Sequence, residues 1–137
     1  MTPAEKIRHL VDDLAIIDDP QERLAHVVAR AKRLAPLPAE ARNDANRVRG
    51  CVSVVWLAGE MIDGRCSFRC AADSPIVQGL LVLQCEFFSD LTPSEAAACE
   101  LDPLEATGLL RNLSPTRRNG LASALNAIRA FARTHAT

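Results

Sequence analysis

The sequence predicts an α+β fold in which a small antiparallel β-sheet packs in two layers against flanking helices. Three observations predict it. Six pairs of a polar residue followed by proline indicate helix starts. One β-branched region contains the sequence of a hairpin turn. No segment is long enough to be a linker between domains. We therefore expect the 137 residues to form a single domain over residues 1–137.

The predicted helices begin with a polar N-cap followed by proline at the first helical position. At four starts a glutamate follows at the third helical position, from which its carboxylate is expected to reach back to the cap. These four caps are Thr2, Asp19, Thr92 and Asp102, whereas Ser74 and Ser114 lack the glutamate. The predicted helices span residues 3–17, 20–35, 75–89, 93–99, 103–111 and 115–134. The helix from Pro75 is apolar nearly all round, which predicts a buried central position.

Two segments between the second and third helices have strand character. "CVSVVWLAGEM" and "RCSFRCAAD" flank Ile62-Asp63-Gly64, which is a hairpin signal. Because side chains alternate along a strand, Cys66, Phe68 and Cys70 share one face, which we expect to face the core. Before this region, "APLPAEARND" (residues 35–44) interrupts the helical pattern and predicts an extended connection.

Charge and composition exclude several function classes. The 16 basic and 17 acidic residues give a net charge of −1, so no field attracts nucleic acid or an anionic membrane. Aromatic residues make up only 4% of the chain and tyrosine is absent, which disfavours base stacking. No apolar run reaches transmembrane length, and the charged start "MTPAEKIRHL" lacks the apolar region of a signal peptide. We expect a cytoplasmic protein with no nucleic-acid or membrane partner.

Five cysteines in a reducing compartment do not indicate a disulfide framework. There is no C-x-x-C motif, and Cys66 and Cys70 lack a second ligand pair, so no metal site is expected. Cys85 lies in the apolar helix and is expected to pack as a small hydrophobe. Cys99 ends a short helix, and its exposure is left open. The histidines are expected at solvated helix positions; they are His9, His26 and His135.

Cys51 differs from the other four cysteines. In "NRVRGCVSVVW" it follows Gly50 in a loop, with Arg47 and Arg49 close in sequence. Nearby positive charge lowers the pKa of a thiol and favours the reactive thiolate. The residues alone leave two interpretations open: a small core residue at the start of a strand, or a thiol placed for chemistry.

A resemblance favours the second interpretation. The segments "NRVRGCVSVVW", "ADSPIVQGLL", "LTP" and "LSPTRRNGL" resemble the SufE/CsdE family of sulfur acceptors in order and nearly in spacing. The resemblance implies an α+β fold related to IscU and a Cys51 that accepts a sulfane sulfur from a cysteine desulfurase of the SufS/CsdA kind. It implies onward transfer to an acceptor such as an iron–sulfur cluster scaffold. It implies no cofactor in this chain, because the pyridoxal phosphate resides in the partner.

Other residues receive roles under the same resemblance. Arg47, Arg49 and Arg117 are expected to dock the partner or stabilise the thiolate. Arg117 lies in the first turn of a helix, where the dipole disfavours a cation, and this favours a functional role. The apolar neighbours of Cys51 are expected to shelter a persulfide; they are Gly50, Val52, Val54, Val55 and Trp56.

Three other functions compete with sulfur transfer. An IscU-type cluster scaffold needs a late cysteine, and none follows Cys99. A peroxide or disulfide reductase needs a resolving cysteine or a C-x-x-C motif. An adaptor that binds and regulates a desulfurase without carrying sulfur remains the alternative.

Overall fold

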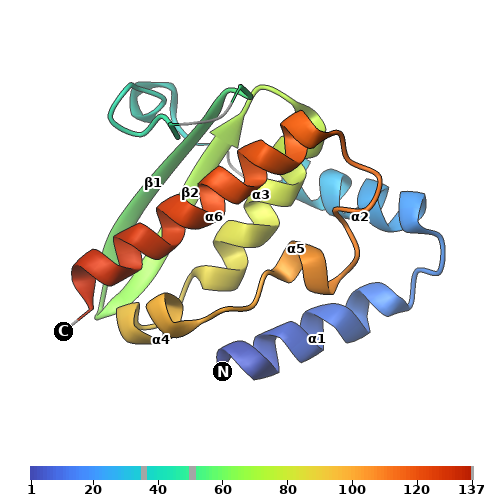
Figure 1. Ribbon diagram of the computed structural model, residues 1–137, viewed down its shortest axis with the longest axis horizontal. Coiled ribbons are helices and arrows are strands. Elements are labelled where there is room, and N and C mark those ends of the chain that lie inside the picture. The colour runs from blue at the N-terminus through green and yellow to red at the C-terminus, as the bar shows by residue number, and fades with distance from the viewer. Residues whose placement is uncertain (35–36, 50–51, 137) are drawn as a thin grey trace.

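The computed structural model describes residues 1–34, 37–49 and 52–136. The elements are α1 (Pro3–Ala15), α2 (Pro20–Lys32), a 3-10 turn (Ala39–Ala41), β1 (Val55–Ile62), β2 (Arg65–Ala72), α3 (Pro75–Phe88), α4 (Pro93–Ala98), α5 (Pro103–Ala106) and α6 (Pro115–His135). In Figure 1 helix α6 runs alongside the antiparallel hairpin of β1 and β2, with α3 beside it. Helix α2 packs on α3, and α1 packs on α3 and α5. The predicted α+β class is confirmed.

All six predicted helix starts are present, and at each the cap side chain accepts a backbone N–H. The expected return bond from the glutamate occurs at Thr2 and Thr92. Asp19 and Asp102 instead accept from the second helical residue. A threonine hydroxyl can donate to the glutamate, as Thr2 does to Glu5 at 2.9 Å, whereas an aspartate carboxylate repels it.

The predicted helix over 103–111 is too long, because α5 ends at Ala106. Gly108 takes a φ of +74°, a left-handed conformation that ends helices. The Leu109 N–H then donates to the Leu104 carbonyl at 3.0 Å, which closes the turn. The glycine was visible in the sequence, but the apolar pattern continued through it.

The hairpin turns at Asp63 and Gly64, whose φ angles of 51° and 79° are those of a type I′ turn. Met61 pairs with Cys66, and Gly59 with Phe68. The predicted inner face is confirmed, since Cys66, Phe68 and Cys70 are buried. The first strand begins later than predicted, at Val55, because Val52 and Ser53 form bends.

Helix α3 is the buried centre that the sequence predicts. Leu80, Leu81 and Phe88 are fully buried, and α2 approaches α3 so closely that Val28 Cα lies 2.9 Å from where a Cβ on Gly79 would stand. Cys85 packs inside this layer as a small buried residue. The three histidines are exposed, as expected. Among the helices of the described residues, none has the length and apolarity needed to cross a bilayer.

Candidate functional site

The loop that carries the predicted acceptor is closed at its base by backbone hydrogen bonds. The Val48 N–H donates to Val55 at 2.9 Å, and the Leu57 N–H donates to Asn46 at 2.8 Å. Val48 and Val55 are both buried, so the two ends of the loop are anchored in the core. Gly50 and Cys51 themselves lie outside the described residues. On either side of them, Arg49 is exposed and the Val52 side chain is 81% exposed.

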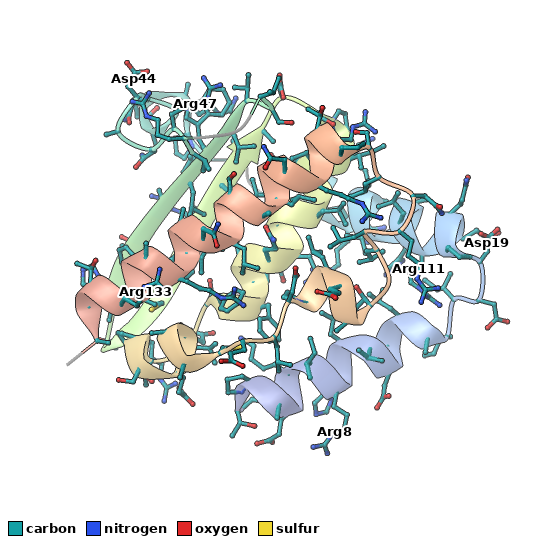
Figure 2. All side chains as sticks on the ribbon, viewed as in Figure 1. Arg8, Asp19, Asp44, Arg47, Arg111 and Arg133 are labelled. Atoms are coloured by element: carbon teal, nitrogen blue, oxygen red, sulfur yellow. The ribbon has the colours of Figure 1, made fainter. Side chains whose placement is uncertain are left out.

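The segment of residues 37–49 leads into this loop and forms a compact set of turns. The predicted extended connection is wrong for the described part, because side chains bond to nearby carbonyls instead. Arg42 Nε donates to Leu37 at 2.9 Å, and Asn46 Nδ2 donates to Ala41 at 2.8 Å. Figure 2 shows Asp44 and Arg47 on this segment, which lies beside the start of β1, where the backbone of Arg47 bridges to Trp56.

Helix α6 supports the other side of the loop. A Cβ placed on Gly120 would lie 3.2 Å from Ser53 Cβ, so the missing side chain lets the loop approach the helix. The Asp73 N–H also donates to the Val54 carbonyl at 3.3 Å, which ties the loop to the end of β2. Sequence reasoning missed the roles of Gly120 and Asn46. The Asn-rich stretch before Arg47 was the available signal for local turns.

The three predicted arginines do not line one cavity. Arg47 and Arg49 line a groove of about 580 Å³ between the 37–49 segment, β1 and α6. Arg117 lines a second cavity, of about 410 Å³, between α2, the start of α3 and the start of α6. On α6, Gly120 lies one helical turn after Arg117 of the second cavity and one turn before Ser123 of the groove. Ser53 contacts the helix at Gly120, so this contact lies between the two cavities.

Arg47 has an unsatisfied buried donor. Its Nε is buried and has no hydrogen-bond partner within the described part of the chain, while its backbone bridges to Trp56. A buried guanidinium nitrogen without an acceptor is costly. Arg47 and Arg49 are the charged residues among the described residues that line the groove, so the groove suits an anion such as a thiolate or a carboxylate.

The predicted shelter residues have different surroundings. Val55 is fully buried and faces the core, Val54 and Trp56 are half-buried, and Val52 is exposed. Their role toward a persulfide stays a prediction.

The other cysteines have the environment of unreactive thiols. A hydrogen bond with Cys70, together with burial, raises the pKa of the Cys85 thiol well above its usual value. Burial also raises the pKa of Cys66. Cys99 is 8% exposed. Within the described residues, no group of three or more His, Cys, Asp or Glu side chains is placed to hold a metal ion.

Comparison with known proteins decides the family. Residues 8–132 match the model of the SufE family, described as an Fe-S metabolism associated domain. The chain belongs to the SufE family. The match spans all described parts of the candidate site, from Asn46 through Gly120.

SufE-like proteins of three bacteria align with most of this chain. One from Synechocystis sp. is 36% identical over 74% of this chain and 64% of its own length. One from Rhizobium meliloti is 34% identical over 90% of this chain and 91% of its own length. One from Rhizobium etli is 35% identical over 93% of this chain and 89% of its own length.

A solved structure has the same fold. The solution structure of a hypothetical protein from Thermus thermophilus superposes with a TM-score of 0.76 at 18% identity and covers 98% of each chain. This likeness concerns the fold alone. SufE membership is consistent with a sulfur-transfer partner of a cysteine desulfurase.

Proposed function

We propose that Cys51 accepts a sulfane sulfur from the persulfide of a cysteine desulfurase. The observation that carries the proposal is the SufE family match over residues 8–132, which includes the loop of Cys51. The exposed flanks Arg49 and Val52 support it, because an acceptor has to be reached by a second protein.

The reaction needs one thiolate on this chain. The Cys51 thiolate attacks the outer sulfur of the desulfurase persulfide, and a new S–S bond forms to Cys51 as the old one breaks. The electron pair of the broken bond leaves on the desulfurase cysteine as a thiolate. The outer sulfur keeps its proton, so no external oxidant or reductant is consumed. Pyridoxal phosphate chemistry belongs to the partner.

The surrounding cations favour the reactive form of the acceptor. Arg47 and Arg49 line the groove beside the loop. Arg117 lies one helical turn from Gly120, where the loop contacts α6. Positive charge stabilises a thiolate and attracts an acidic docking surface. The loaded chain then passes its sulfur to a further acceptor, such as an iron–sulfur cluster scaffold, in the cytoplasm.

Mass spectrometry after incubation with a cysteine desulfurase and cysteine tests the proposal. The parent chain is expected to gain one sulfur atom on the peptide that contains Cys51. Cys51→Ser should remove both the added sulfur and the stimulation of the desulfurase. Cys99→Ser is the matched control and should retain both. A Cys51→Ser variant that stimulates as well as the parent would overturn sulfur carriage and favour the adaptor alternative.

Substitution of an arginine tests the cationic surroundings separately. Arg117→Ala should slow sulfur acceptance at low desulfurase concentration, and added salt should narrow the difference from the parent. Arg133→Ala is the control, because Arg133 is exposed near the C-terminal end of α6, at the opposite end of the helix from Arg117 (Figure 2). If both substitutions slow sulfur acceptance equally, the effect comes from the net charge of the chain and not from the position of Arg117.

A further inference from the structure

Two buried thiols meet where β2 packs on α3. Cys70 lies on the inner face of β2 and is 6% exposed, and Cys85 lies on α3 and is 3% exposed. Both thiols line one small cavity, and the Cys70 side chain contributes to the raised pKa of Cys85, so the two thiols lie close together. Neither takes part in the proposed sulfur transfer, so the pair is a nucleophilic cluster without an assigned role.

The pair is open to a small ion. Cys70 and Cys85 both line a cavity of about 130 Å³, whose wall also includes Leu34, Arg69 and Glu86. Leu34 and Arg69 are exposed, so the cavity connects the sulfurs with the surface. Cys66 and Cys99 are equally buried but do not line this cavity.

The ligand set selects the kind of ion. Thiolates prefer soft cations, and zinc in proteins takes four ligands in a tetrahedron. Within the described residues no third His, Cys, Asp or Glu is placed with this pair to complete such a site. We propose that Cys70 and Cys85 form a two-coordinate site for a soft monovalent cation, with Cu(I) as the fitting ion.

The binding step balances without a redox partner. Two S–H bonds break, two Cu–S bonds form, and two protons leave to solvent while copper stays monovalent. The resulting bis-thiolate carries one negative charge. Arg69 lines the same cavity and offers a positive charge. Glu86, whose negative charge disfavours a thiolate at Cys85, is offset by Arg30 through two hydrogen bonds of 2.7 Å. The site does not depend on the proposed function of Cys51.

Disulfide formation is the competing fate of the pair. It requires an oxidant, and it begins from a thiolate. Copper binding needs no oxidant, because a soft metal displaces the thiol proton directly. The disulfide is therefore an outcome that the test has to distinguish.

Anaerobic competition with the chromogenic Cu(I) chelator bicinchoninate tests the site. All proteins carry Cys51→Ala, so that the loop thiol does not bind copper. The Cys51→Ala protein should take one Cu(I) per chain from the chelator. A triple variant that also carries Cys66→Ala and Cys99→Ala should still bind one Cu(I). A triple variant that also carries Cys70→Ala and Cys85→Ala should bind none. Both triple variants keep two cysteines, so the comparison is matched in thiol number.

Three results would overturn the proposal. The Cys51→Ala protein takes no copper from the chelator, both triple variants lose copper binding equally, or the variant without Cys70 and Cys85 still binds copper. X-ray absorption of the copper-loaded Cys51→Ala chain gives a readout that needs no core substitution. Two sulfur neighbours in a linear arrangement are expected. A three-coordinate or nitrogen–oxygen shell, or a mass lower by two hydrogens that indicates a disulfide, would contradict the assignment.

Discussion

Helix α3 and the segment 37–49 show two ways of holding a chain in place. Nine of the 14 residues of α3 are buried. Within 37–49 only Leu37 and Val48 are buried, and the rest is held by hydrogen bonds such as that from Asn46 to Ala41. Apolar burial therefore stabilises the scaffold, while side-chain bonds to the backbone shape the segment that leads to Cys51. Substitutions in α3 should destabilise the whole protein, whereas substitutions in the segment 37–49 should mainly alter the loop of Cys51.

The largest expected effect is that of Phe88→Ala at the end of α3. Phe88 is fully buried and packs edge-to-face on Phe87, with ring centroids 5.0 Å apart. Truncation of such a residue costs about 3–5 kcal/mol of unfolding free energy. Urea unfolding measures the loss. Under conditions where the variant stays folded, sulfur acceptance should equal that of the parent; a selective loss of acceptance would break the division between the two regions.

Gly79→Ala should have the next largest effect, within the same scaffold. The new methyl would meet the backbone Cα of Val28 at 2.9 Å, and backbone cannot rotate away as a side chain can. Overpacking costs about 1–3 kcal/mol, and the better helix propensity of alanine returns about 1 kcal/mol. A net destabilisation is expected in urea unfolding. A stabilised variant would show that α2 can move off α3 freely.

Asn46→Ala tests the 37–49 segment. The substitution removes the 2.8 Å bond to the Ala41 carbonyl, which is worth about 1 kcal/mol. We expect a small loss of stability but a clear slowing of sulfur acceptance by Cys51, because the turn before the loop is loosened. Thr134→Ala is the matched control, because it also removes a side-chain bond to a backbone carbonyl, of 3.0 Å to Ala130, at an exposed position of α6. If stability and acceptance both fall as in Phe88→Ala, the segment is part of the scaffold.

The same contrast explains what the sequence could predict. The six helix starts, the hairpin turn at Asp63-Gly64 and the buried face of Cys66, Phe68 and Cys70 depend on local chemistry and on periodicity, and all are confirmed. The end of α5 was missed because the apolar pattern continues past Gly108, whose left-handed conformation stops the helix.

The candidate site was less predictable, because its geometry depends on contacts between distant residues. Nothing local at Gly120 indicates that Ser53 will pack against it, and nothing local at Cys70 indicates Cys85 as a partner. Charge and resemblance point to the three arginines, but only the fold shows that Arg117 lines one cavity while Arg47 and Arg49 line another. The extended connection was wrong because asparagine and arginine side chains fold the segment into turns.

Gly120→Ala should change stability least and still affect the loop. The added methyl would stand 3.2 Å from Ser53 Cβ, so the loop has to give by a few tenths of an ångström. Because alanine gains about 1 kcal/mol of helix propensity, the net change in unfolding free energy should stay near zero. Sulfur acceptance should nevertheless slow, since the displaced residue lies two positions from Cys51. Ser53→Gly in the same chain removes the opposing Cβ, so the double variant should recover the acceptance rate of Ser53→Gly alone, and the cycle should show coupling between the two positions. Additive effects of the two substitutions would mean that the contact between α6 and the loop does not position the acceptor.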